Sequence, residues 1–372
     1  MAARVAKRPV ARGQSTVARR QCDLRRGDAG SFAAPCSHDR DAQGAEKERE
    51  MSPDRLDKTR TTPPPFSWKP VYTGVDLASA SLYTPLDPKA SGPREQNVNV
   101  ARVDLRTPGL ELFTTPPEGP YQTIGQRCTD FLDSHPEVML AINANFSWPG
   151  GASVGDPFSL LGLAISRGLV VCNPAAPAPQ PDPPPEPLPD VPDDTWAGAV
   201  ALLVTRDNRA RIQTVTAACP CDLSDVWTAI AGGRNPGPGW PPQSYGPGPQ
   251  QVLVRGRNMA VPQEDPIEGV AARTGVGLSK DGSTLYLLTI DGIEGQPYGA
   301  DFYDLAAWLL HAGAYAGFAL DGGGSTTMAR RDVSGRAILV NDPHGNETSE
   351  ILQRVVGNFF GVITSPLASA RR

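Results

Sequence analysis

Long hydrophobic runs are absent from this sequence, and cysteine and histidine are scarce. No stretch approaches the ~18–20 consecutive apolar residues of a membrane-spanning helix, so we expect no transmembrane segment. Six cysteines are too few and too scattered for a fold that depends on disulfides. Only three of the four histidines lie beyond residue 50, so a histidine-based catalytic triad has little support.

An excess of positive charge is also lacking, because the formal net charge is −5. A nucleic-acid-binding domain usually presents a basic surface, so we expect no nucleic-acid partner. Hydrophobic residues make up 39% of the chain, which is enough for a core. The 38 glycines and 39 prolines are well above average usage. Loops and turns must therefore occupy much of the chain, which argues against an all-helical bundle.

The first fifty residues differ from the rest, with 11 Lys and Arg against 7 Asp and Glu. They show no helical or strand periodicity and no apolar run long enough for a secretory signal. We interpret residues 1–65 as a disordered basic tail, and a basic arm for an acidic partner is the functional alternative. The pair Lys47-Glu48 can be encoded by AAGGAG, a bacterial ribosome-binding sequence. Its distance from Met51 is suitable, so we expect Met51 to be the true start.

Residues 66–366 have the patterns of one ordered domain with hairpins and a few helices. Apolar runs flank turn residues such as Lys280-Asp281-Gly282, which is typical of hairpins. Apolar residues recur at helical spacing in Asp301–His311. A Pro-rich insert at residues 173–194 and a Gly/Pro-rich loop at residues 232–250 interrupt the pattern.

Two acid-glycine segments carry the chemistry that stands out most. Asp321–Thr327 reads DGGGSTT after an apolar strand, and such glycines let backbone N–H groups approach an anion. A glycine turn capped by hydroxyl side chains is the structural alternative. Asp291-Gly292 ends a second apolar strand. Carboxylates that converge at one edge of a sheet serve glycosyl transfer, and alternatively they bind a divalent cation.

Residues with amide and guanidinium side chains also lie next to the ends of predicted strands. Asn143 and Asn145 lie at the end of a short apolar strand, Glu137–Asn143, where amides can bind sugar hydroxyls or simply form a turn. Arg273 precedes a glycine-flanked strand, and arginine is the bidentate partner of phosphate. Taken alone, such an arginine is more often a surface residue.

In this order, the segments resemble the phosphodiester glycosidase family from about residue 98 to 364. The most distinctive matches are LYLLTIDG at Leu285–Gly292 and FALDGGGSTTM at Phe318–Met328. AINANF at Ala141–Phe146, ARTGVG at Ala272–Gly277 and RVVGNFFGV at Arg354–Val362 also match. The chain departs from the family pattern at Asn145, which replaces a glycine, and before Arg273, where the usual His-Pro is missing.

The resemblance implies a fold of the α+β class with a mixed central sheet. It also implies a hydrolase that cleaves the sugar C1–O bond of a sugar-1-phosphodiester, such as an α-N-acetylglucosaminyl phosphodiester. It implies a small-molecule or glycan phosphodiester as partner, no obligatory cofactor, and the catalytic residues Asp291, Asp321 and Arg273. The implied substrate-binding residues are Asn143, Thr274, Gly322, Gly323, Ser325 and Thr326. The chemistry of the side chain of Asn145 and of the backbone of Gly324 adds these two residues to the expected substrate-binding set. Similar proteins are often exported, whereas this sequence shows no signal peptide and is assigned to the cytoplasm only by default.

Two rival functions remain open at this point. One is a non-catalytic domain that binds carbohydrate or phosphate with the same fold. The other is a metal-assisted phosphoesterase that cleaves the P–O bond, with a divalent cation at Asp291 and Asp321. Chelator sensitivity and the destination of ¹⁸O from labelled water separate these alternatives.

Overall fold

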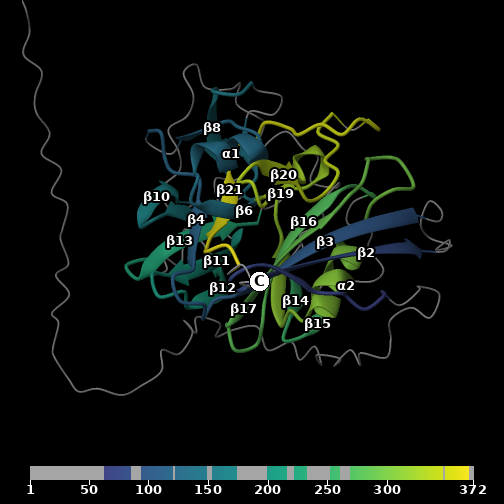
Figure 1. The fold of residues 1–372 in the computed structure, drawn as a ribbon, viewed down its shortest axis with the longest axis horizontal. Helices are drawn as coiled ribbons and strands as arrows, with labels where there is room; N and C mark the ends of the chain where they lie inside the picture. Colours follow the sequence, from purple (N-terminus) through teal and green to yellow (C-terminus); the bar gives the residue numbers. More distant parts are fainter. Residues whose placement is uncertain are drawn as a thin grey trace, which may run out of the picture. The chain divides into compact units, whose positions relative to one another are not determined.

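The fold was analysed in a computed structural model of the chain (Figure 1). It describes residues 63–84, 94–119, 122–148, 153–173, 199–215, 222–232, 252–259, 269–346 and 348–367. All of these lie in one compact unit, Met51–Arg372. Apart from their first or last few residues, the predicted tail and both predicted inserts fall outside the described residues, so those assignments stay predictions.

The expected α+β class with a mixed sheet is wrong, because every pairing between the named strands is antiparallel. The described residues contain two α-helices, α1 (Cys128–Ser134) and α2 (Phe302–Ala312), so the fold is closer to all-β. Hairpin connections explain the difference. They join neighbouring strands in antiparallel fashion, whereas parallel strands need long crossovers that are usually helical.

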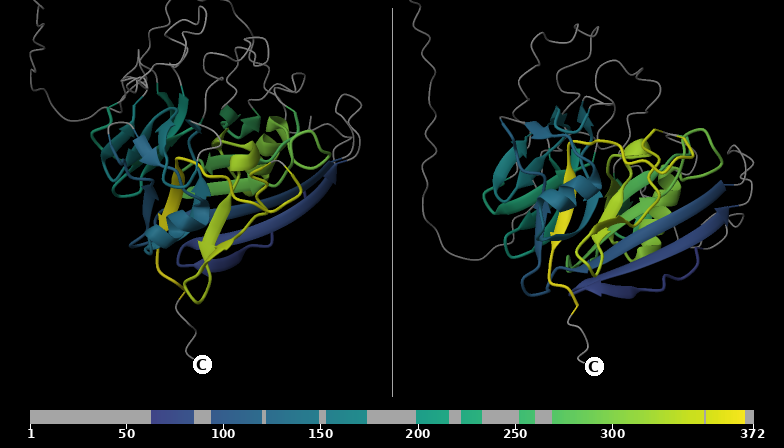
Figure 2. Two further views of the ribbon diagram at one scale, coloured as in Figure 1. Left: turned by 90° about the horizontal axis from the view of Figure 1, so that it is seen from above. Right: turned by 45° about the horizontal axis from the view of Figure 1, so that its top comes forward.

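The largest sheet has eight strands in the order β1-β2-β3-β17-β16-β18-β14-β15. Its long strands β2 and β3 are the purple and blue arrows of Figure 2. The strands are β1 (Lys69–Tyr72), β2 (Val75–Thr84), β3 (Arg94–Asp104), β14 (Val252–Arg255), β15 (Asn258–Met259), β16 (Arg273–Leu278), β17 (Thr284–Ile290) and β18 (Ala316–Ala319).

Helix α2 packs on one face of this sheet (Figures 1 and 2). Its buried Leu305 and Leu309 share a core cluster with Val98 and Val100 of β3 and with Leu288 of β17. An Asp301 side chain caps its N-terminus, and a left-handed Gly313 (φ 112°) ends it. The helix predicted at residues 301–311 is therefore confirmed to within one residue at each end.

The opposite face of β3 and β17 is apolar along only part of its length. Ala101, Val103, Leu285 and Leu287 pack into a second core cluster with strands from the other sheets. Alternation along a strand places residues 97 and 99 of β3 on this same face, and both are asparagines. Because this face changes from apolar to polar residues along β3, a site can form at its polar end, which carries residues 97 and 99.

Three smaller antiparallel sheets complete the described fold. One contains β10-β9-β13-β11-β12, another β20-β19-β6-β21-β4, and the third β5-β8-β7. Their strands are β4 (Glu111–Thr114), β5 (Gln122–Ile124), β6 (Val138–Asn143), β7 (Ser147–Trp148), β8 (Pro157–Leu160), β9 (Ala164–Ser166), β10 (Leu169–Cys172), β11 (Ala199–Thr205), β12 (Ala210–Val215), β13 (Val226–Ala231), β19 (Met328–Arg331), β20 (Ala337–Leu339) and β21 (Phe359–Ile363).

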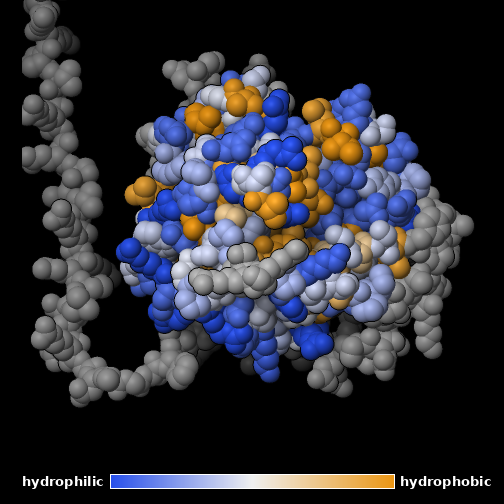
Figure 3. Space-filling view, in the orientation of Figure 1, coloured by the Kyte–Doolittle hydropathy of each residue, from blue (hydrophilic) through white to orange (hydrophobic). Residues whose placement is uncertain are grey.

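The surface is mixed in character. Figure 3 shows small groups of hydrophobic side chains dispersed among hydrophilic ones on the face in view. Within the ranges that the structure describes, neither helix is long and apolar enough to cross a bilayer.

Candidate active site

Three neighbouring strands bring Asp291, Arg273 and Asp321 to one edge of the large sheet. Asp291 directly follows β17, Arg273 begins β16, and Asp321 lies two residues beyond β18. Strand β16 lies between the other two and pairs antiparallel with both. Adjacent strands are about 4.8 Å apart, so about 10 Å separates the backbones of the two aspartates. The structure thus places the three residues expected to be catalytic at the same edge.

Asp291 is buried, with 3% of its surface exposed. One carboxylate oxygen, Oδ1, accepts from Asn341 Nδ2 (2.8 Å) and from the Asp342 backbone N–H (3.2 Å). Burial raises the pKa of Asp291 to about 7, although these two hydrogen bonds oppose the rise and the nearby Asp342 carboxylate adds to it. A carboxyl group with this pKa can both release and accept a proton near neutral pH.

Asp321 is also a carboxyl group with a raised pKa. Loss of hydration raises its pKa to about 7, while hydrogen bonds from Ser325 and the Gly322 amide and the charge of Arg354 act to lower it. Arg354 packs against Gly324 so closely that a side chain at Gly324 would collide with the guanidinium group. The sequence analysis placed Arg354 in a matching segment but did not identify it as a site residue.

Several backbone N–H groups of the Gly-rich loop, Asp321–Thr327, form hydrogen bonds within the protein. The loop forms a 3-10 turn at Gly323–Ser325. The amide of Gly323 donates to the Ala272 carbonyl (2.8 Å), and the amide of Thr326 donates to the Gly323 carbonyl (3.1 Å). The amide of Gly322 bonds to the Asp321 carboxylate. The amides of Gly322 and Gly323, expected to bind an anion, are therefore engaged within the protein in this conformation.

Asn143 fixes this loop to the sheets on either side. Its Nδ2 donates to the Asp321 carbonyl (2.7 Å), and its Oδ1 accepts from Thr274 Oγ1 (2.9 Å) and the Thr327 amide (3.0 Å). Thr274 Oγ1 also lies 3.2 Å from Thr326 Oγ1. These side chains are buried, so their contacts describe positioning of the loop rather than direct contact with a ligand.

Asn145 lies among different partners. Its Nδ2 donates to the carbonyls of Leu161 (2.8 Å) and Leu163 (3.1 Å). Its Oδ1 accepts from the Ala231 amide (3.2 Å) and from Asn358 Nδ2 (2.9 Å). Both hydrogens and both lone pairs of this amide are therefore used within the fold. The contacts support a structural role for Asn145, and its binding of substrate stays a prediction.

Arg273 is held rigidly with 6% of its surface exposed. Its Nε donates to the Ala300 carbonyl (3.1 Å) and its Nη2 to the Gly269 carbonyl (2.6 Å). The guanidinium carbon lies 4.4 Å from the centre of the Phe302 ring. A Cβ added to Gly322 would lie 3.7 Å from Arg273 Nη1, so the guanidinium group adjoins the Gly-rich loop.

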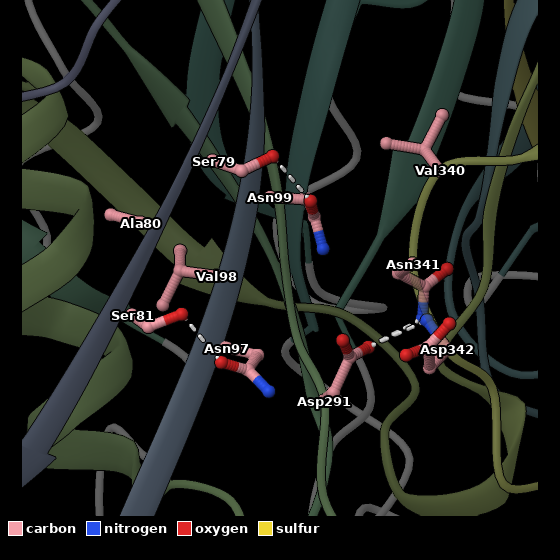
Figure 4. A pocket seen from close by; sticks show the side chains of 10 residues that line it. All are labelled: Ser79, Ala80, Ser81, Asn97, Val98, Asn99, Asp291, Val340, Asn341 and Asp342. Carbon is pink, nitrogen blue, oxygen red and sulfur yellow. Dashed lines mark hydrogen bonds between the residues drawn. The ribbon is translucent and has the colours of Figure 1, made fainter.

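A cavity of about 180 Å³ opens beside Asp291 (Figure 4). Strands β2 and β3 form one wall, and the segment after β20 forms the other. Of the residues that line the cavity, only Asp291 was expected from the sequence to belong to the site. The polar lining consists of Ser79, Ser81, Asn97, Asn99, Asp291, Asn341 and Asp342.

Metal binding was an open alternative for the two aspartates. The described ranges contain no group of three or more His, Cys, Asp and Glu residues arranged to hold a metal ion. A cation at Asp291 and Asp321 would need ligands from elsewhere, such as carbonyl groups or water. It stays a hypothesis.

The candidate site belongs to an antiparallel β protein and has two protonatable carboxyl groups at the same sheet edge as a buried arginine. Residues 188–363 match the model of the phosphodiester glycosidase family, a span that contains Arg273, Asp291 and Asp321. This match confirms the resemblance inferred from the sequence. Asn143 and Asn145 lie outside the matched span.

The chain also resembles three solved structures, one of them with a TM-score of 0.50. The catalytic domain of zebrafish N-acetylglucosamine-1-phosphodiester alpha-N-acetylglucosaminidase, auto-inhibited by its pro-peptide, is 17% identical with a TM-score of 0.50, covering 80% of this chain and 88% of that chain. A hypothetical protein from Synechocystis is 15% identical with a TM-score of 0.44, covering 81% and 64%. A protein of Burkholderia pseudomallei described as exported is 16% identical with a TM-score of 0.43, covering 74% and 75%. No curated protein matches the sequence.

Proposed function

We propose that this protein hydrolyses the bond between the sugar C1 and the phosphate oxygen of a sugar-1-phosphodiester. The observation that carries the proposal is that Asp291, Arg273 and Asp321 lie at three adjacent strand ends, and that both carboxyl groups have a pKa of about 7. The match to the phosphodiester glycosidase family supports it. An α-N-acetylglucosaminyl phosphodiester is the first substrate to test, because the zebrafish enzyme of similar fold is named for that substrate.

The chemistry requires modest help with the leaving group. A phosphate monoester departs as a weakly basic anion, so the main tasks are to stabilise an oxocarbenium-like sugar and the departing charge. Asp291 and Asp321 suit the first task, with one of them acting as nucleophile or as base toward water. Arg273 and Arg354 suit the second. Water supplies the new C1 hydroxyl, and the phosphate monoester carries away the electrons of the broken C1–O bond.

Asp321→Asn tests the assignment, because it keeps the shape of the side chain and removes its charge. We expect the variant to fold and its turnover to fall by ~10²–10⁴-fold, as for loss of a catalytic acid–base group. Asp207→Asn is the matched control, since Asp207 lies in the exposed turn between β11 and β12. Full activity in Asp321→Asn would remove Asp321 from the catalytic residues.

The cleaved bond has its own test. Hydrolysis in ¹⁸O-labelled water should place the label on the sugar C1 hydroxyl. Label in the phosphate, together with loss of activity in a chelator, would replace this proposal by a metal-assisted phosphoesterase. Absence of turnover on a panel of sugar-1-phosphodiesters would favour a binding domain.

A further inference from the structure

The cavity beside Asp291 has a regular construction. Ser79 of β2 pairs directly with Asn99 of β3, and Ser81 pairs with Asn97 two residues along. The Asp291 amide donates to the Asn97 carbonyl (2.9 Å), so Asp291 extends the second row onto the next strand. Residues directly opposite one another in antiparallel strands share a face of the sheet. Two polar rows therefore cross the sheet about 7 Å apart.

Each serine fixes the orientation of its asparagine. Ser79 Oγ donates to Asn99 Oδ1 (2.7 Å), and Ser81 Oγ donates to Asn97 Oδ1 (2.6 Å). With the oxygens turned to the serines, both Nδ2 groups point away from them, toward the side of the cavity where Asp291 and Asn341 lie (Figure 4). The sheet thus presents oriented amide donors to the interior of the cavity.

The Asn99 donor is available to a ligand. Asn97 Nδ2 has two long hydrogen bonds, to Glu95 and to the Tyr298 hydroxyl, both at 3.3 Å. Among the residues that the structure describes, no group accepts a hydrogen bond from Asn99 Nδ2, although Asn99 is only 8% exposed. A nearly buried amide donor that faces a cavity is a recognition group for whatever enters it.

The lining chemistry selects the kind of ligand. Amides, hydroxyls and the carboxylates of Asp291 and Asp342 line the cavity, and none of its lining residues is Lys or Arg. Such a lining repels phosphate but suits hydroxyl groups, which donate to carboxylates and accept from amides. The cationic groups Arg273 and Arg354 adjoin the Gly-rich loop instead.

We propose that this cavity binds the sugar of the substrate, with Asn99 donating to one sugar hydroxyl and Asp342 accepting from another. The phosphate then lies outside the cavity, toward the Gly-rich loop that Arg273 and Arg354 adjoin. The link to turnover rests on the proposed function, whereas binding of the sugar can be measured without any reaction.

Ligand-detected NMR titration of the full chain with free N-acetylglucosamine tests the assignment, with inorganic phosphate as a second probe. We expect the wild type to bind the sugar, and Asn99→Leu to weaken binding by about threefold to tenfold, the usual effect of one lost hydrogen bond. Asn99→Asp keeps the shape and removes the donor, so it provides a second variant if the leucine disturbs folding. Asp76→Asn is the matched control, because it removes the cross-strand pair of Asp76 with Arg102 on the same two strands but the opposite face.

The possible results separate this inference from the proposed function. Sugar binding of wild-type strength in both Asn99 variants would overturn it, and so would a wild type that binds phosphate but no sugar. If Asn99 variants lose sugar binding while no phosphodiester is cleaved by the wild type, the sugar site stands and the hydrolase proposal fails. Conversely, turnover with unchanged kinetics in these variants leaves the hydrolase and removes the sugar site.

Discussion

Asp291→Asn should make the protein more stable above neutral pH while it removes activity. The carboxyl group is buried, and burial raises its pKa from 3.8 to about 7. Both hydrogen bonds to the side chain end on the same oxygen, Oδ1. An asparagine can present its carbonyl oxygen at that position, so it keeps both bonds and removes only the buried charge.

The sign and size of the effect follow from the pKa difference. Between about pH 4 and pH 7 the folded protein holds the Asp291 proton that the unfolded chain has already lost. Stability from this group is therefore complete below pH 4 and is lost as the pH rises toward 7. About three pKa units at about 1.4 kcal/mol each give about 4 kcal/mol. That is a large part of the ~5–15 kcal/mol by which domains are usually stable.

Urea unfolding followed by tryptophan fluorescence at pH 4, 6 and 8 measures this effect. We expect similar midpoints for the wild type and Asp291→Asn at pH 4, and a higher midpoint for the variant at pH 8 with an unchanged slope. Asp321 acts in the same direction, so the difference between the two proteins, rather than the wild-type curve alone, isolates Asp291.

Asp281 lies in the hairpin that leads into β17. It provides a control, because its substitution is expected to change stability at pH 8 in the opposite direction. Hydrogen bonds from Ser279 and Ser283 lower its pKa to about 2, so its charge stabilises the fold above the unfolded pKa and Asp281→Asn should destabilise at pH 8. The reasoning is refuted if Asp291→Asn lowers the midpoint at pH 8 as Asp281→Asn does. That result would mean that the fold requires the charge of Asp291.

Three further predictions concern Arg273, Asn145 and the buried cysteines Cys128 and Cys172. Arg273→Lys should lower kcat/KM on phosphodiesters by ~10²-fold or more, because lysine cannot reproduce the planar fork. The deficit should shrink on glycosides without phosphate, and an equal loss on both would argue against a phosphate contact. Asn145→Ala should lower the free energy of unfolding by about 2–4 kcal/mol because four hydrogen bonds are lost, while KM of the folded fraction stays unchanged. Burial raises the pKa of Cys128 above its usual range and that of Cys172 to about 12, so neither should react with a thiol reagent at pH 8 until the protein unfolds.

Local features of the fold could be predicted from the sequence because their causes are local. The hairpin at residues 276–290 turns where expected, with Gly282 at φ 70°. The strand predicted at residues 137–143 is β6. The predicted α+β fold class was wrong because local sequence patterns predict poorly how many hairpins and helices the whole fold contains. Helix α1 has only seven residues and contributes little to the architecture.

Site residues whose roles depend on contacts with residues far away in the sequence could not be predicted in the same way. Arg354 reaches Asp321 across a chain separation of more than thirty residues, and a surface position would give it the same sequence pattern. Asn145 shows a related difficulty, because a polar residue after a strand is compatible both with ligand binding and with structural hydrogen bonds. Only the hydrogen-bond partners of Asn145 distinguish the two roles, and these partners come from three separate segments of the chain.

The position of Asn99 shows why the cavity itself was missed. Alternation along β3 identifies its two faces, and a polar face is ordinarily the face toward solvent. Here β3 lies between β2 and β17 in the middle of the sheet. The polar end of its inner face lines the cavity together with the segment that follows β20. The register of β3 with β17, set by residues almost two hundred positions away, turns an ordinary alternating strand into one wall of the candidate site. Polar residues that alternate on a central strand are therefore better candidates for a binding site than the same residues on an edge strand.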